Sequence, residues 1–596
     1  MTKPAPTPIA TVDALWEALP PTGTWNTAAN WNPAMVPTGT ATFATSSQTT
    51  IGFDQVQPGQ QSPPVGGIAF AAGAPSYTLL LNQPAPNDPA LTINGAGIAN
   101  SSGGTQQIVV ASSAVKYTEP QLRFTGSASA GGQNVAYEVG PTTPSAAGGG
   151  AIQFCENSTA GSASFTIRTG AGTPPKHNST VGGEVGFSDT SNAGTARFLV
   201  YGTTGSDGDT FGNAAFHDSS SAAGAVFTNA GGTVYQGDGG NTQFFDNSTA
   251  ASGLYHNEGG TVKGAYGGDV AFDSTANGRN GHFHNYAATA DGGSGGVTSF
   301  NNNPPYMNPS TLGASAGSGL FFNYGAKASG QGGGHTFFTA KSGSPTAAQG
   351  TFVNYGSAVS GTASAAGHTV LSITLPQETP YCPDAGDATF WNFPGTAPGA
   401  PGGNTQLTVY SDKGAPISGS KGPTAGSATF INLGAIASGA GGGQTTFGGT
   451  SSAEHATLIA LGGAAGGEGG WITFMSESSG GTASVSLSGN GTLDLSSHDA
   501  PGVTIGSLSL AGGCIRTTVG SGTTCLSVSG NVSISASPVA FAFVAGSGFA
   551  TNTPYTVLTA PNLSSLSASR FSGNALPQGS PTFAIVGNEL QVTFGP

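Results

Sequence analysis

The chain has 596 residues, of which 99 are Gly and 38 are Pro, and only 7% of its residues are charged. This composition excludes a fold of long helices, which need Leu, Glu, Lys and Arg at helical spacing. The 32 Phe residues argue against a disordered chain. The net charge is −14 with only 14 Lys and Arg, so we expect no nucleic-acid partner, because phosphate binding needs clustered cations. We also expect no membrane insertion, since no run of about 18 apolar residues occurs.

The first part of the chain, residues 1–64, contains Trp16, Trp25 and Trp31 in an irregular segment. Large aromatic side chains can cover the unpaired strand edge at the end of a repetitive sheet. We therefore predict an N-terminal capping segment over residues 1–64. Its first residues lack the apolar stretch of a secretory signal.

Residues 65–485 are predicted to form the main body, because aromatic residues recur there in a fixed register. Two series repeat every 28 residues: Phe216, Phe244, Phe272 and Phe300 in one, and Phe227, Tyr255 and Phe283 in the other. Such a repeat indicates one structural unit stacked on copies of itself, with each series forming a buried core stack.

One period contains three short runs that suit strands, separated by paired glycines that suit sharp corners. In the best example the runs are residues 225–227, 233–235 and 242–244. Each strand would pair in parallel with its equivalent in the next coil. The sequence thus predicts an all-β fold, a right-handed, three-sided parallel β-helix with about 28 residues per coil.

Polar residues follow each aromatic series at a constant offset of two. One set is Asn229, Asn257 and Asn285, and the other is Asp218, Asp246, Ser274 and Asn302. Asn and Asp tolerate left-handed backbone conformations and bond to nearby amides, so stacked copies can satisfy buried backbone groups. We interpret both sets as structural ladders.

The acidic members of the second set, with Glu156 and Asp189, also raise the possibility of catalysis, since polysaccharide-cleaving β-helices use clustered carboxylates. Stacked carboxylates repel each other and would need a cation, proton sharing or backbone donors. Ser274 and Asn302 continue the series without charge, which favours a structural role. We therefore expect no catalytic residue, and the chain is interpreted as a non-enzyme.

No cofactor or metal is expected either. His256 and His284 are 28 residues apart, but two imidazoles alone make a weak metal site. Cys514 and Cys525 are 11 residues apart and could form a disulfide, although strands of adjacent coils could equally place two free thiols side by side.

Residues 486–596 alternate Ser with Leu and Val, which predicts strands with one solvated face. We expect this region to contain the final coils and a C-terminal cap.

Several motifs carry a family resemblance. They are Trp-Asn-Thr-Ala-Ala-Asn-Trp at 25–31, Phe-Asp-Asn-Ser-Thr-Ala at 245–250 and Gly-Asn-Glu-Leu-Gln-Val-Thr-Phe at 587–594. Together the chain resembles autotransporter-type β-helix proteins with passenger repeats, without their C-terminal translocation barrel. The resemblance implies a bacterial protein at the cell surface or outside the cell.

These observations predict a non-enzymatic structural or adhesive β-solenoid that assembles with itself into a fibre or surface layer. Small neutral surfaces would allow close packing, and exposed end edges would permit addition. One alternative is a carbohydrate-active β-helix enzyme, either a polysaccharide lyase or a glycosidase. Another is an adhesin that binds surface glycans through exposed aromatics such as Trp391 and Trp471.

Overall fold

A computed structural model describes most of the chain, and its description covers residues 11–53, 63–82, 90–112, 120–140, 149–169, 182–204, 211–301, 312–340, 343–375, 381–411, 421–536, 538–577 and 579–595. The chain divides into two compact units, Met1–Tyr255 (unit 1) and His256–Pro596 (unit 2). The described residues of both units are strands, turns and short 3-10 segments, so the predicted all-β parallel β-helix is confirmed.

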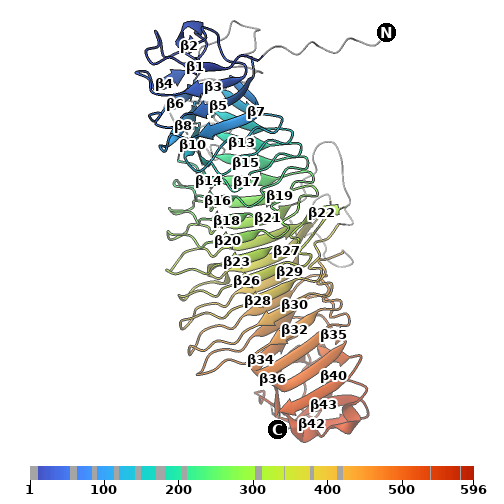
Figure 1. Cartoon of the computed structure of the whole chain (residues 1–596). Helices are drawn as coiled ribbons and strands as arrows, with labels where there is room; N and C mark the ends of the chain where they lie inside the picture. Colours follow the sequence, from blue (N-terminus) through green and yellow to red (C-terminus); the bar gives the residue numbers. More distant parts are fainter. Residues whose placement is uncertain are drawn as a thin grey trace, which may run out of the picture. The chain divides into compact units, whose positions relative to one another are not determined.

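Unit 1 is built from two series of strands in which each strand pairs in parallel with its equivalent one coil away (Figure 1). The first series is β3 (Thr40–Phe43), β5 (Val65–Phe70), β7 (Leu91–Asn100), β9 (Gln121–Phe124), β11 (Ala151–Phe154), β13 (Glu184–Phe187), β15 (Asn213–Phe216) and β17 (Asn241–Phe244). The second series is β4 (Thr50–Gly52), β6 (Thr78–Leu81), β8 (Gln106–Val110), β10 (Val135–Val139), β12 (Ser164–Ile167), β14 (Arg197–Val200) and β16 (Val226–Asn229).

The third side of each coil in unit 1 is narrow. It consists of single-residue bridges that continue from coil to coil through Gly97, Ser129, Thr159, Asn192, Ser221 and Thr249. The run 233–235, expected to be a strand, is instead a turn in which the Gly237 amide donates to the Val234 carbonyl at 3.0 Å. Gln236 reverses the chain there with a left-handed backbone, φ 57°, and this leaves Tyr235 exposed.

The start of unit 1 contains β1 (Ala14–Trp16), the 3-10 segment η1 (Ala28–Asn30) and β2 (Trp31–Asn32), and β1 pairs antiparallel with β2 and parallel with β3. Trp16, Trp25 and Trp31 are buried and pack around Phe43, with ring centroids 5.6 to 6.1 Å from it. These side chains fill the interior next to the first strands of the unit.

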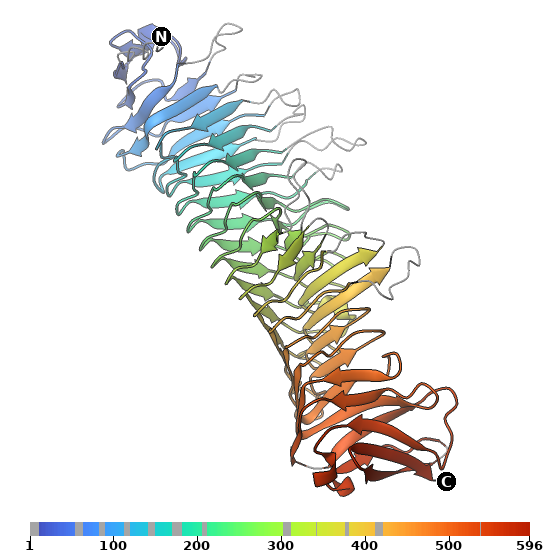
Figure 2. The ribbon, with the colours of Figure 1, turned by 90° about the vertical axis from the view of Figure 1, so that its right-hand side faces the viewer.

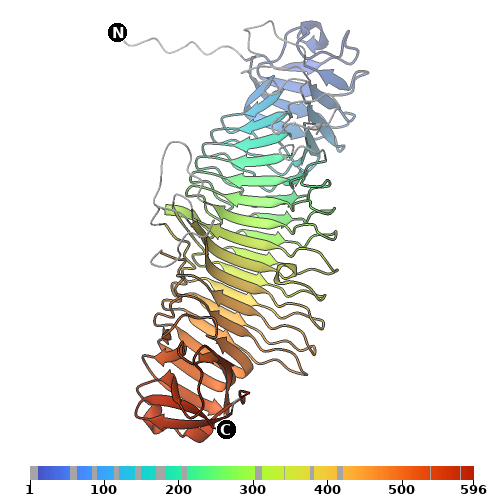
Figure 3. The same cartoon turned by 180° about the vertical axis from the view of Figure 1, so that it is seen from behind.

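The coils of unit 2 repeat the same scheme (Figure 3). One series is β19 (Asp269–Phe272), β21 (Val297–Asn301), β24 (His335–Thr339), β27 (His368–Leu375), β29 (Asn404–Ser411), β31 (Gln444–Phe447) and β33 (Trp471–Phe474). The other is β20 (His282–Asn285), β23 (Leu320–Asn323), β26 (Thr351–Asn354), β28 (Thr389–Asn392), β30 (Thr429–Asn432), β32 (Thr457–Ala460), β34 (Ser484–Asp494) and β36 (Ser507–Val519). A small additional pair is β22 (Leu312–Ser315) and β25 (Ser344–Thr346). β18 (Leu254–Asn257) lies at the division between the units.

The end of unit 2 differs from its coils and contains antiparallel strands (Figure 2). Its elements are β35 (Gly502–Ile505), β37 (Cys525–Val528), β38 (Val532–Ala536), β39 (Val539–Ala545), β40 (Pro554–Thr559), β41 (Phe571–Gly573), β42 (Ser580–Val586) and β43 (Glu589–Gly595), with 3-10 segments η4 (Leu563–Ser565) and η5 (Ala568–Arg570). Strands β40, β43 and β42 run antiparallel, and alternate residues of β43 are buried. An antiparallel hairpin at this position ends the parallel series.

The aromatic series form stacked columns inside both units. Phe216 lies directly beside Phe244 in the strand register, and Phe272 lies beside Phe300, which confirms the 28-residue coil. Each of these two ring pairs stacks at 4.7 Å. The second series meets the first edge to face, as Phe227 does with Phe216 at 5.9 Å. Later coils are longer, since Phe283 pairs with Phe321, and the extra residues lie in the loops.

Candidate functional site

The asparagine set forms a hydrogen-bonded ladder in the interior of unit 2. Asn257 Nδ2 donates to Asn285 Oδ1 at 2.8 Å, and Asn285 Nδ2 donates to Asn323 Oδ1 at 2.8 Å. The ladder continues through Asn354, Asn392 and Asn432 at 2.8 to 2.9 Å. All these side chains are fully buried. A continuous chain of amides satisfies polar groups that would otherwise be buried without partners.

A column of buried threonines supports this ladder and was not recognised in the sequence. Thr298, Thr336 and Thr405 each donate a hydroxyl to an asparagine Oδ1 at 3.0 Å, and Thr242 bonds to Asn229 in the same way at 2.9 Å in unit 1. Each of these four threonines follows its asparagine by 13 residues, with a loop between. That fixed spacing is the signal that would have identified them.

The acidic set forms a column at an exposed corner of unit 1. Glu156, Asp189, Asp218 and Asp246 all have left-handed backbones, with φ between 54° and 57°. Each carboxylate accepts the backbone N–H of the residue one coil earlier. The bonds are Gly126 N to Glu156 at 2.6 Å, Glu156 N to Asp189 at 2.8 Å, Asp189 N to Asp218 at 3.0 Å and Asp218 N to Asp246 at 3.1 Å. Backbone N–H groups are therefore the donors that stabilise the stacked carboxylates of this column.

Ser274 occupies the equivalent corner position in unit 2, with φ at 57°, and is buried. Asn302 lies outside the described residues.

The disulfide considered for Cys514 and Cys525 is not formed, and all four cysteines are free. The reason is topological. Cys514 lies on β36 beside Ala540, whereas Cys525 lies on β37 beside Gly502 in a different sheet. Burial raises the pKa of Cys514, and it raises the pKa of Cys525 to about 11, so both are protonated thiols at neutral pH.

The strands β20, β23, β26, β28, β30 and β32 of unit 2, with the residue that directly follows each of them, carry two columns of aromatic and aliphatic side chains on their outward side, which we call the outward face. Its residues are His284, Phe322, Val353, Trp391, Ile431 and Ile459 in one column, and Tyr286, Tyr324, Tyr355, Phe393, Leu433 and Leu461 in the other. Eleven are half-buried and Leu461 is exposed. None of the twelve is an Asp, Glu, Lys or Arg.

The tyrosines of the outward face cover one another. Tyr286 stacks on Tyr324 at 5.0 Å, and Tyr324 stacks on Tyr355 at 5.2 Å. The Tyr324 hydroxyl oxygen is also 2.9 Å from His284 Nδ1. Burial lowers the pKa of His284 to about 4, helped by His256 and His282, and raises the pKa of Tyr324 to about 12, helped by Tyr286 and Tyr355. The ring faces inside the column are thus unavailable to a ligand, while the ring edges face solvent.

His256 occupies a similar position beside this face. Its ring stacks on His284 at 5.3 Å, and its Nδ1 is 3.0 Å from the Tyr286 hydroxyl. The two histidines singled out in the sequence are therefore brought together, but each has its Nδ1 directed to a tyrosine.

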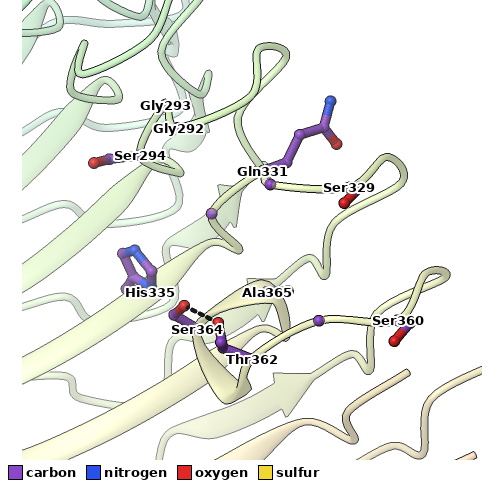
Figure 4. A pocket seen from close by; sticks show the side chains of 13 residues that line it. Gly292, Gly293, Ser294, Ser329, Gln331, His335, Ser360, Thr362, Ser364 and Ala365 are labelled. Atoms are coloured by element: carbon purple, nitrogen blue, oxygen red, sulfur yellow. Dashed lines mark hydrogen bonds between the residues drawn. The ribbon is translucent and has the colours of Figure 1, made fainter. Parts of the chain in front are cut away.

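Unit 2 also contains a polar cavity of about 430 Å³. Three loop segments from successive coils bound it, at residues 292–294, 329–332 and 360–365, and His335 lies at the start of the strand below. Figure 4 shows the His335 ring directed into the space between Ser294 and Ser364. The other lining residues are Gly, Ser, Thr, Gln and Ala, so His335 is the one titratable side chain among them.

His335 has a second histidine beside it. His368 is its register partner on the next strand, and the two Nδ1 atoms are 3.2 Å apart. His368 Nδ1 is also 3.2 Å from the Ala366 carbonyl oxygen. Burial lowers the pKa of both histidines, so both imidazoles are neutral at neutral pH. The sequence signal is the shared Gly-His-Thr motif at 334–336 and 367–369, hidden because this coil spans 33 residues.

Comparison with known proteins gives no match, either to a protein-family model or to a curated protein. Within the described residues, no three His, Cys, Asp or Glu side chains gather as metal ligands. No helix among those residues has the length and apolar character needed to span a membrane.

Proposed function

We propose that the chain is a non-enzymatic structural or adhesive β-solenoid, located outside the bacterial cell or on its surface, that associates with copies of itself through the outward face of unit 2. The observation that carries this proposal is the outward face itself: twelve uncharged, mostly apolar side chains in two columns on adjacent coils. Contiguous apolar patches on a surface mark interaction sites more often than they mark inert surface.

Two arguments favour a second copy as the occupant. The side chains repeat at the strand spacing of about 4.8 Å, and another β-solenoid has the same spacing, so the ridges of two copies can interdigitate. The chain also has a net charge of −14, and two copies meeting at this face would not bring carboxylates of the face together.

The proposal is tested by measuring association of the purified chain over a range of concentrations, by analytical ultracentrifugation and electron microscopy. Trp391→Asp places a charge in the centre of the outward face and is expected to abolish association, because a carboxylate buried between apolar surfaces is strongly unfavourable. Thr446→Asp is the matched control, since Thr446 is also half-buried at an outward position, but on β31 of the other strand series. Equal association of wild type and Trp391→Asp would contradict the proposal.

The carbohydrate-active alternative rests on the acidic column of unit 1, whose carboxylates already accept backbone N–H groups. Turnover of acidic polysaccharides that is lost in Asp218→Asn would establish it in place of the structural role. The glycan-binding alternative rests on Trp391 and Trp471, which are both half-buried at outward positions of β28 and β33.

A further inference from the structure

We propose that the polar cavity of unit 2 binds a neutral ligand that carries several hydroxyl groups, such as a monosaccharide. This site does not depend on self-association, because none of the residues that line the cavity belongs to the outward face.

The loops that connect the two strand series of unit 2 are hydrogen-bonded to one another at their tips. A glycine at each tip donates its N–H to the carbonyl oxygen of the tip glycine one coil later. The bonds are Gly264 to Gly292 at 2.8 Å, Gly292 to Gly330 at 2.8 Å, Gly361 to Gly399 at 3.4 Å, Gly399 to Gly439 at 2.7 Å and Gly439 to Gly466 at 3.0 Å. Along these described loops, the series is interrupted between Gly330 and Gly361.

The interruption has a cause in the sequence. Thr369 follows Asn354 by 15 residues, whereas Thr336 and Thr405 follow their asparagines by 13. The loop between β26 and β27 is therefore two residues longer than the loops on either side of it, and it contains the 3-10 segment η2 (Ala363–Ala365). The cavity of about 430 Å³ lies at this interruption, between the segments 329–332 and 360–365 (Figure 4).

The interruption leaves both a donor and an acceptor at the cavity. The Gly330 N–H and the Gly361 carbonyl oxygen make no backbone hydrogen bond in the described loops, although the corresponding groups of the regular coils bond to each other. The residue before a tip glycine lies against the tip glycine of the next coil, as Ser438 does against Gly466. By the same geometry, Ser329 is directed into the gap. A hydroxyl group both donates and accepts, so it fits such a set of partners.

Side chains on the other walls continue this pattern. The His335 ring is directed between Ser294 and Ser364, and its Nδ1 already faces His368 at 3.2 Å, which leaves Nε2 for a ligand (Figure 4). The Thr362 and Ser364 hydroxyl oxygens are 2.8 Å apart. Hydroxyl groups rotate to donate or to accept, so these side chains also suit a ligand with several hydroxyl groups.

The charges around the cavity favour a neutral ligand. Among the described residues that line it, none is an Asp, Glu, Lys or Arg. One charge of each sign lies nearby at the loop tips, since Asp291 packs against Gly330 and Lys263 packs against Gly292. The volume lies within the range of about 300–1,000 Å³ that is usual for small-molecule sites.

The test is saturation-transfer difference NMR of the untagged full-length chain with D-glucose, D-galactose, D-mannose and N-acetyl-D-glucosamine, each titrated separately. We expect at least one of them to bind saturably, with a dissociation constant of about 1 mM for a ligand of about 12 non-hydrogen atoms. D-glucuronate and D-glucosamine, titrated in parallel, should bind no more tightly, because the lining offers no charge to pair with theirs.

Two variants locate the binding. Ser329→Trp fills the gap and should weaken binding by at least about 10-fold through steric exclusion. Ser438→Trp is the matched control, since Ser438 is also exposed before a tip glycine, but at an intact part of the series, and it should bind as the wild type does. Trp391→Asp should also bind as the wild type does, which separates this site from glycan binding at the outward face.

His335→Phe keeps a ring of similar size and tests the cavity from a second wall, whether or not Ser329→Trp folds. It should weaken binding by about 10-fold, because a ligand hydroxyl loses its partner. No saturable binding of any of the four neutral sugars by the wild type would overturn the proposal. Binding that is equal in Ser329→Trp, His335→Phe and the wild type, or that is lost in Trp391→Asp, would also overturn it.

Discussion

At the residue scale, the asparagines of the buried ladder in unit 2 are each hydrogen-bonded to other buried side chains. Asn354 accepts from Asn323 and Thr369 and donates to Asn392 and Thr405. We expect Asn354→Ala to lower the free energy of unfolding by about 3 kcal/mol, because each buried group left without a partner costs about 1–3 kcal/mol. Urea denaturation followed by circular dichroism measures this loss.

Asn432, at the end of the ladder, is the matched control for that experiment. In the described part of the chain its Nδ2 has no hydrogen-bond partner, and its register neighbour is Ala460. Asn392 would keep the Gln444 carbonyl and the Thr445 hydroxyl as acceptors if Asn432 were removed. Asn432→Ala should therefore lower the free energy of unfolding by less than half as much as Asn354→Ala. Equal losses would show that the hydrogen bonds of the ladder do not determine its contribution to stability.

His284 provides a pH dependence at the same scale. Its pKa is about 4 in the folded chain, against about 6.5 in an unfolded chain. Between these values the unfolded state binds a proton that the folded state does not, so stability falls as the pH is lowered from about 6.5 to about 4. Denaturation midpoints at several pH values should show a weaker decline for His284→Phe than for the wild type over this range. Parallel declines would contradict the assignment.

At the scale of elements, the corner that follows β15 combines a left-handed backbone with a side-chain acceptor. Asp218 has a φ of 55°, and its carboxylate accepts the Asp189 amide at 3.0 Å. Asp218→Asn keeps both features and should be nearly neutral. Asp218→Ala removes the acceptor and leaves a residue that tolerates the left-handed backbone less well, so it should destabilise the protein by at least about 1–2 kcal/mol. Thermal denaturation of the two variants side by side distinguishes them, and equal melting temperatures would argue against a corner role.

The elements also show what a sequence can reveal. The 28-residue coil was predictable because Phe216 and Phe244 occupy identical positions in consecutive coils. The asparagine ladder was predictable for the same reason. The turn at 233–235 was not, because Thr, Val and Tyr favour a strand, whereas the turn depends on the left-handed backbone of Gln236, with φ at 57°. The pairing of His335 with His368 was hidden because loop insertions change the coil length, and a fixed period cannot follow them.

At the scale of the whole molecule, charge and apolar surface act against each other. The chain carries −14 net charges, so copies repel one another at long range, whereas the outward face of unit 2 favours contact at short range. Raising the ionic strength from about 10 mM to about 150 mM shortens the Debye length from about 30 Å to about 8 Å. The repulsion is then screened while the apolar attraction remains. Self-association should therefore strengthen with salt, as measured by sedimentation velocity at fixed protein concentration.

If association depended on ion pairs between copies, salt would weaken it, and the outward face would not be the contact. Trp391→Asp separates the two explanations further, since it should remain unassociated at both salt concentrations only if the apolar face is the site.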